Sequence, residues 1–167
     1  MAVKAYKPTT PGRRGMTTQD FSKVTAKKPL KSLTVIKRRT NGRNNRGVIT
    51  VRHRGGGAKR FYRLVNFTQL DIKSATVEAI EYDPNRSARI ARILDENNKY
   101  HYIIAGSGMT VGSKVTVGEK SAIEEGNRLA LKDIPAGTFV HSIELQAGRG
   151  AQMVRSAGAK AQLTAKE

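Results

Sequence analysis

Short runs of alternating hydrophobic and polar residues fill the middle of the chain and predict β-strands. The predicted strands are residues 48–53, 60–67, 75–82, 88–94, 99–105 and 114–117. Asp83-Pro84-Asn85 between two of them has the composition of a tight turn, and residues 95–98 have that of a hairpin loop. Six short strands joined by tight turns are typical of a small β-barrel.

A second set of hydrophobic runs follows, and it predicts the start of another β module. Its strands are expected at residues 128–131, 138–145 and 151–155. In the middle run, Phe139, Ile143 and other alternate residues share one face, as in a half-buried strand. Because three strands cannot close a barrel, this second module is expected to be incomplete.

Residues 1–47 lack regular runs of hydrophobic residues and are predicted to form an extended arm. Prolines and glycines interrupt every possible helical period in this segment. Its one local cluster of hydrophobic residues consists of Leu30, Leu33, Val35 and Ile36. We expect these four side chains to attach the arm to another part of the structure.

The distribution of charge along the chain indicates that the arm binds a partner. Of the 31 Lys and Arg residues, 18 lie in residues 1–63, where Asp20 is the only acidic residue; the remaining chain has 13 basic and 12 acidic residues. Such a segment repels itself until a polyanion neutralises it. A solvated basic tail is the alternative, but the many arginines and the glycine-rich turns between them favour nucleic acid, since arginine grips phosphate in pairs of hydrogen bonds.

Composition also excludes several classes of protein. The 167 residues suit one domain or two small ones, without cysteine for a disulfide scaffold or a thiolate metal site. The sequence has neither an apolar stretch of about 18 residues, as a membrane span requires, nor the apolar core of a secretory signal at its start. A cytoplasmic location is therefore expected.

The sequence shows no recognisable catalytic or metal site. His53, His101 and His141 are far apart and lack partners at metal-ligand spacing. The glycine-rich segments 55–60 and 106–108 match neither the P-loop nor the dinucleotide fingerprint. No enzyme activity and no cofactor are predicted; magnesium ions are expected to bridge phosphates of the bound nucleic acid without a dedicated protein site.

Residues 52–63 carry the strongest nucleic-acid signal, with basic residues, a flexible glycine triplet and two aromatic rings within twelve positions. Arg54 and Tyr62 are therefore candidates for phosphate contact and base stacking. Downstream, Arg86, Arg89 and Arg92 are expected to extend the basic surface.

Five longer strings resemble a known family. They are PTTPGRR (8–14), GRNNRG (42–47), RHRGGGAKRFYR (52–63), EYDPNRSA (81–88) and GRGAQMVRSAG (148–158). In this order and across nearly the whole chain, they resemble the second protein of the large ribosomal subunit in its bacterial form.

The resemblance implies a mainly β protein with a basic RNA-binding extension (1–59), an OB-fold RNA-binding domain (60–120) and the start of an SH3-like barrel (121–167). It further implies a structural constituent of the large subunit that binds ribosomal RNA near the peptidyl-transferase region and supports assembly, subunit association and translation. The expected partners are large-subunit ribosomal RNA, neighbouring ribosomal proteins and the small subunit, with no membrane and no small-molecule substrate. The protein is then not an enzyme.

Matching the motifs residue by residue implies a set of RNA contacts on this chain. They are Arg13, Arg14, Arg43, Asn44, Arg46, Arg52, His53, Lys59, Arg60, Arg63, Arg86, Arg149, Gln152, Arg155 and Ser156. Family members usually carry His where this chain has Ala58, and they continue beyond residue 167 to finish the SH3-like barrel. Truncation of the chain is therefore expected, because an open β edge invites aggregation; the alternative is that the missing half is supplied separately.

Two other readings stay open on the sequence. The first is a free OB-fold protein that binds single-stranded nucleic acid transiently. The second is a phosphate-handling enzyme, which a nucleotide would stabilise against heat.

Overall fold

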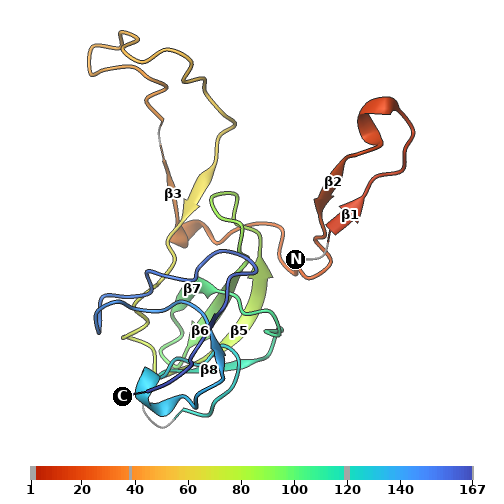
Figure 1. Ribbon diagram of the computed structural model, residues 1–167. Helices are drawn as coiled ribbons and strands as arrows, with labels where there is room; N and C mark the ends of the chain where they lie inside the picture. Colours follow the sequence, from red (N-terminus) through yellow and green to blue (C-terminus); the bar gives the residue numbers. More distant parts are fainter. Residues whose placement is uncertain (1–2, 38, 119–120, 167) are drawn as a thin grey trace.

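The computed structural model describes residues 3–37, 39–118 and 121–166, and an antiparallel four-stranded sheet lies at its centre. The strands follow the order β7-β6-β5-β8 (Figure 1). They are β5 (Ser74–Glu81), β6 (Ile90–Asp95), β7 (Tyr100–Ile104) and β8 (Lys114–Thr116). All four agree with strands predicted from the hydrophobic pattern.

The alternation of side chains along β5 explains how this sheet builds a core. Ala75 and Val77 are buried, whereas the alternate residues Thr76 and Glu78 are exposed. The pairing with β6 shifts between Val77 and Ala79, and after this irregularity both faces of β5 are buried. The core cluster consists of Ile72, Ala75, Val77, Ile80, Ala91, Ile93, Ile103, Met109 and Val115.

Smaller elements surround the central sheet. Three two-stranded sheets pair β1 (Val3–Ala5) with β2 (Thr17–Gln19), β3 (Thr34–Ile36) with β4 (Phe61–Arg63), and β9 (Phe139–Val140) with β10 (Ala161–Gln162). Short 3-10 turns occur at η1 (Pro11–Arg13), η2 (Lys31–Leu33) and η3 (Leu131–Asp133). The predicted mainly β class is confirmed. Within the described ranges, the strands form separate small sheets and do not close into a continuous barrel.

Five predicted strands differ from the structure. The runs 60–67 and 138–145 are strands only over the short elements β4 and β9, and three further runs form no strand. Residues 48–53 form an exposed loop, with a single bridge between Arg43 and Ile49, because no neighbouring sheet covers these side chains. Residues 128–131 and 151–155 contribute only isolated bridges, Val117 to Arg128 and Ile143 to Met153.

Two projections extend from the body of the protein in Figure 1. One is the hairpin of β1 and β2, drawn in red. The other is the long loop of residues 39–60 between β3 and β4, drawn in orange and yellow. The predicted arm is therefore divided into two looped segments, and the chain between them returns to the central sheet.

The predicted apolar anchor of the arm is held mainly by its backbone. Val35 and Ile36 are exposed, while Leu30 and Leu33 are half-buried. The Leu33 carbonyl accepts a hydrogen bond from the Leu64 amide at 2.9 Å. Main-chain pairing thus supplies much of the attachment that the sequence assigned to hydrophobic side chains.

Residues 121–166 attach to the central sheet through polar contacts. The Glu125 carboxylate accepts hydrogen bonds from the Gly108 amide at 2.9 Å and the Ser107 hydroxyl at 3.0 Å. These bonds hold the pKa of Glu125 below its ordinary value. The Arg128 amide donates to the Thr116 carbonyl at 3.0 Å. The predicted domain boundary after residue 120 adjoins residues 119–120, which lie outside the described residues.

Candidate nucleic-acid interface

The turn at residues 83–87 brings together three sequence strings that are far apart in the chain. Arg60 donates from Nη1 to the Pro84 carbonyl at 3.1 Å, and Asn85 donates from Nδ2 to the Phe61 carbonyl at 2.8 Å. On the other side, the Ala157 amide donates to Ser87 Oγ at 3.2 Å. The basic strings 52–63 and 148–158 therefore meet at this turn, and we call the assembled region the junction.

The buried Asp83 carboxylate gives the turn its shape. Its Oδ1 accepts a hydrogen bond from the Asn85 amide at 2.9 Å, and its Oδ2 accepts one from Arg86 Nε at 2.6 Å. Asp83 is fully buried, so these bonds compensate for the water it loses. One acidic residue thus fixes the position of Arg86 beside the basic strings.

Two of the predicted RNA-contacting arginines lie over the ring of Phe67. The guanidinium carbons of Arg86 and Arg155 are 5.6 Å and 5.0 Å from the centre of its ring. Both distances are within the range of a cation–π interaction. The Ala151 amide also donates to the Phe67 carbonyl at 2.9 Å, which brings the 148–158 string against the body. Sequence analysis missed this role of Phe67, since its partners come from distant segments.

Glu144 organises the loop that carries Arg149. Its carboxylate pairs with Arg128 and accepts hydrogen bonds from the amides of Gly148, at 2.8 Å, and Gly150, at 2.9 Å. Gly150 has a φ of +82° and lies against the Phe67 backbone, where an added Cβ would approach within 3.1 Å. Gly150 therefore permits close packing of the loop on the body.

The loop of residues 42–51 forms the end of the 39–60 projection, and we call it the tip. The Gly42 carbonyl accepts hydrogen bonds from the amides of Thr50, at 2.9 Å, and Val51, at 3.1 Å. Asn44 Oδ1 accepts from the amides of Arg46 and Val48, both at 3.0 Å. The predicted RNA-contacting residue Asn44 thus shapes the loop that presents its basic neighbours.

Replacing Gly42 with Ala should open the tip. Gly42 has a φ of +73°, and a Cβ there would overlap the Val51 carbonyl oxygen. We expect the Thr50 and Val51 amides to lose their protection from hydrogen exchange, while the core keeps its protection. The matched control is Gly47→Ala, which has a similar φ of +79° but open space around the added atom. Equal protection in the two variants would contradict this account of the tip.

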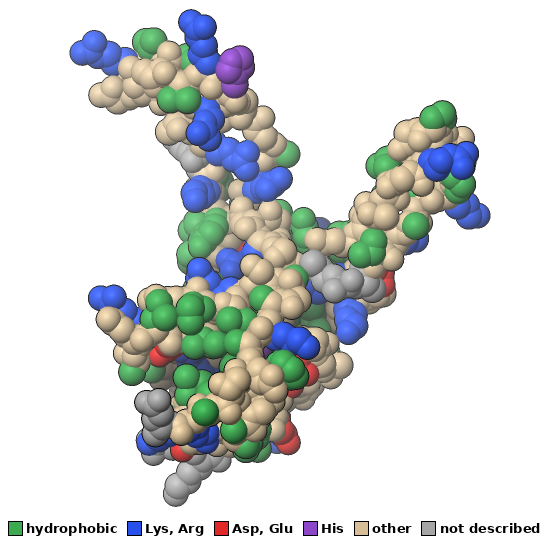
Figure 2. Space-filling view, in the orientation of Figure 1, with side chains coloured by type: hydrophobic (Ala, Val, Ile, Leu, Met, Phe, Trp, Pro, Cys, Tyr) green, Lys and Arg blue, Asp and Glu red, His purple; other side chains and the backbone are tan. Residues whose placement is uncertain are grey.

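The β1–β2 hairpin carries a second basic loop. Arg13 lies over the Tyr6 ring, with its guanidinium carbon 4.8 Å from the ring centre, and Pro11 opens the short η1 turn. Arg13 and Arg14 are both exposed. In Figure 2, blue Lys and Arg side chains gather at the ends of both projections.

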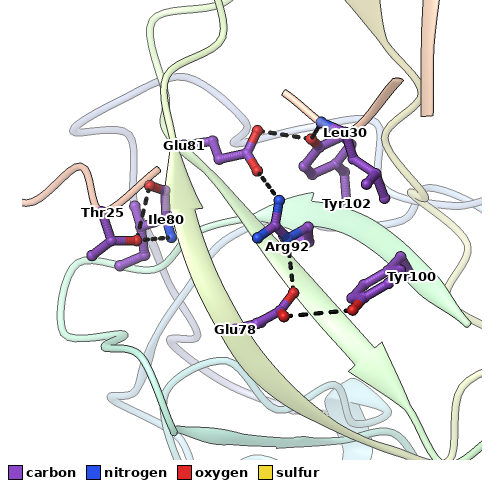
Figure 3. A network of polar contacts seen from close by, with 8 residues as sticks. All are labelled: Thr25, Leu30, Glu78, Ile80, Glu81, Arg92, Tyr100 and Tyr102. Atoms are coloured by element: carbon purple, nitrogen blue, oxygen red, sulfur yellow. Dashed lines mark hydrogen bonds and ion pairs between the residues drawn. The ribbon is translucent and has the colours of Figure 1, made fainter. Parts of the chain in front are cut away.

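A buried polar network fixes the arm between the two projections (Figure 3). The Tyr102 hydroxyl donates to Glu81 Oε2 at 2.7 Å and accepts a hydrogen bond from the Leu30 amide at 2.9 Å. Glu81 Oε1 pairs with Arg92 at 3.0 Å. Burial raises the pKa of Glu81, and burial also raises the pKa of Tyr102 to about 12.

A second contact holds the same segment to β5. The Ile80 amide donates to Thr25 Oγ1 at 2.9 Å, and the Ile80 carbonyl accepts from the Thr25 amide at 3.0 Å. Ala26 and Glu81 form a parallel bridge beside these bonds. Residues 25–30 therefore run along the body, and both projections start from a fixed base.

Most predicted RNA-contacting side chains are exposed. These are Arg13, Arg14, Arg43, Asn44, Arg46, Arg52, His53, Arg54, Lys59, Arg60, Arg149, Gln152, Arg155 and Ser156. Tyr62 and Arg86 are half-buried. Arg63 is buried, with 7% of its surface exposed, and donates to the Phe61 carbonyl at 2.8 Å. Its guanidinium faces the protein interior.

Arg92 and Arg39 differ from the sequence-based expectation. Arg92 is predicted to extend the basic surface, but it forms ion pairs with Glu78 and Glu81. It is therefore part of the polar network that holds Leu30 by way of Tyr102. Arg39 received no prediction, yet it lies against Gly57, where an added Cβ would overlap its guanidinium. Gly57 therefore makes room for an arginine from the opposite limb of the projection.

Two features are absent from the described part of the chain, a metal site and a membrane span. Across residues 3–37, 39–118 and 121–166, no cluster of three or more acidic, His or Cys side chains could hold a metal ion. In the same ranges, no helix is long and apolar enough to cross a membrane.

The mainly β fold, the junction and the two basic projections define a nucleic-acid-binding protein. Residues 30–117 match the family model described as Ribosomal Proteins L2, RNA binding N-terminal domain. Residues 124–167 match the model described as Ribosomal Proteins L2, C-terminal domain. The chain belongs to the ribosomal protein L2 family. It is accordingly a structural, RNA-binding component of the large ribosomal subunit and not an enzyme.

Proposed function

We propose that the protein binds large-subunit ribosomal RNA near the peptidyl-transferase region, through the junction and the ends of both projections. In this role it supports subunit assembly, association with the small subunit and translation on cytoplasmic ribosomes. The neighbouring ribosomal proteins and the small subunit are its further partners. Magnesium ions bridge RNA phosphates around it.

One observation carries this proposal: the basic strings 52–63 and 148–158, separated in the chain, meet at the turn at residues 83–87. Arg60 and Arg155 are exposed there, and Arg86 lies between solvent and Asp83, with which it forms an ion pair. Such a rigid basic surface fits a folded RNA, whose backbone charges also lie in fixed positions.

The projections extend this surface beyond the body. The segments that form them, residues 3–19 and 39–60, contain no Asp or Glu. An acid-free loop neutralises phosphates without repelling them, and it can reach between RNA helices that the body cannot enter. The projections belong to an RNA-binding extension, which we assign to residues 1–59. We further assign residues 60–120 to the OB-fold domain and residues 121–167 to the start of an SH3-like barrel.

Directed hydroxyl-radical probing tests the location on the RNA. The chain has no cysteine, so a single cysteine at Asn45 in the tip can carry an iron chelate. We expect cleavage of large-subunit RNA in the peptidyl-transferase region. The control is Asn97→Cys, in the exposed turn at the opposite end of the sheet from the junction, which should cleave these nucleotides weakly.

Two outcomes would contradict the proposal. Cleavage from position 45 confined to other regions of the RNA would refute the proposed location. Equal affinity for small-subunit RNA of similar length would refute specific binding to the large subunit.

A further inference from the structure

The tip displays large hydrophobic side chains as well as arginines. Val48, Ile49 and Val51 expose 59%, 57% and 50% of their surface. Single exposed hydrophobic residues are common on proteins, but here three lie within four positions at the end of a projection. Figure 2 shows hydrophobic, basic and histidine side chains together at this end of the molecule.

The hydrogen bonds of the tip hold these side chains in a defined arrangement. The Val48 carbonyl accepts from the Asn44 amide at 3.0 Å, and the Val48 amide donates to Asn44 Oδ1 at 3.0 Å. The Val51 amide donates to the Gly42 carbonyl at 3.1 Å. A preorganised loop loses little conformational freedom when it binds, so its apolar side chains are suited to enter a partner surface.

The surrounding charges select the partner. Arg43, Arg46, Arg52 and Arg54 lie in and beside the tip, and the whole 39–60 projection lacks acidic residues. The partner therefore combines dense negative charge with accessible apolar faces. RNA with unpaired bases has both properties, whereas a paired RNA helix hides its base faces in the stack.

We propose that Val48, Ile49 and Val51 form an aliphatic wedge that packs on the faces of unpaired bases in the bound RNA, while the flanking arginines bind the adjoining phosphates. This inference rests on the proposed RNA-binding function and names the RNA element that the tip contacts. Insertion of aliphatic side chains beside bases is a known mode of nucleic-acid binding.

The double variant Val48→Ser, Ile49→Ser tests the wedge, because it removes apolar surface and keeps every charge. We expect the affinity of the full chain for large-subunit RNA to fall about 10-fold. The slope of log Kd against log salt concentration should stay unchanged, since no phosphate contact is removed. The matched control is Val111→Ser, Ile123→Ser, which alters an exposed Val and Ile, at 49% and 56%, on the body. The control should bind as the wild type does.

A fluorescent readout places the wedge on the bases. The fluorescent base 2-aminopurine is placed at unpaired RNA positions that the iron chelate at residue 45 cleaves. Binding of the wild type should change its fluorescence. The double serine variant should leave the fluorescence near that of free RNA. Both serine variants should melt at the wild-type temperature.

Unchanged affinity in the Val48/Ile49 variant would overturn the wedge and leave the proposed function intact. An equal loss of affinity for a fully paired duplex would also overturn it, since the partner would then not be unpaired bases. Failure of the wild type to bind large-subunit RNA would instead refute the proposed function.

Discussion

Replacing Arg43, Arg46 and Arg52 together with Ala should weaken binding to large-subunit RNA by about 100-fold. All three side chains are exposed on or beside the tip. Losing one phosphate contact of this kind costs about 1 kcal/mol, and three such losses give a factor of this size. The slope of log Kd against log salt concentration should decrease by about 2 to 3, because fewer counterions are released on binding.

The control removes the same charge elsewhere. Lys73, Lys99 and Lys114 are exposed at the end of the central sheet opposite the turn at 83–87, so their triple Ala variant has the same net charge. We expect its affinity to stay within a few-fold of the wild type. If both triple variants lost affinity equally, net charge rather than the projection would govern binding. Filter binding across a potassium chloride series gives both quantities.

The variant Tyr102→Phe should have a lower free energy of unfolding than the wild type at neutral pH. At high pH the wild type should lose stability that the variant keeps. The phenol is fully buried, and its pKa is raised to about 12, chiefly by burial. A raised folded-state pKa means that the associated stability is present below the unfolded value of about 10 and is lost as pH rises through 12. The wild type should therefore lose about 2 to 3 kcal/mol over this interval beyond any loss in the variant.

Urea unfolding of both proteins at pH 8 and at several values from 10 to 12 measures this effect. Lysine titration affects both chains alike, so the difference between them isolates Tyr102. The variant should be less stable at pH 8 by about 1 to 3 kcal/mol, since buried Glu81 loses a hydrogen-bond donor. It should also give faster exchange of the Leu30 amide, which loses its acceptor, whereas the Thr25 amide keeps its bond to Ile80. Parallel pH profiles for the two proteins would show that the phenol is not protected from ionisation.

The hydrophobic pattern predicted the central sheet well because local alternation decides which residues form a half-buried strand. The runs at 75–82, 88–94 and 99–105 became β5, β6 and β7 nearly to the residue. The acidic turn at residue 83 was also recognisable, since its residues shape the backbone through their own side chains. The run at 48–53 failed because β-branched residues indicate a strand only where a sheet lies beside them.

The candidate interface was predictable as a set of residues but not as an arrangement. Charge and glycine content marked the basic strings, whereas nothing local shows that Ala157 reaches Ser87 or that Phe67 contacts two arginines. The burial of Arg63 was hidden for the same reason, because the pairing of β3 with β4 decides it. Contacts between distant segments determine which basic residues face outwards.

The contact between Glu125 and the loop at residues 106–108 has a consequence for nucleotides. An added Cβ at Gly106 or Gly108 would meet the Glu125 side chain, so the carboxylate fills the space next to this loop. The Gly108 amide and the Ser107 hydroxyl already donate to this carboxylate, so they are not available to a phosphate group. We therefore expect no nucleotide to bind at residues 106–108 of the folded chain.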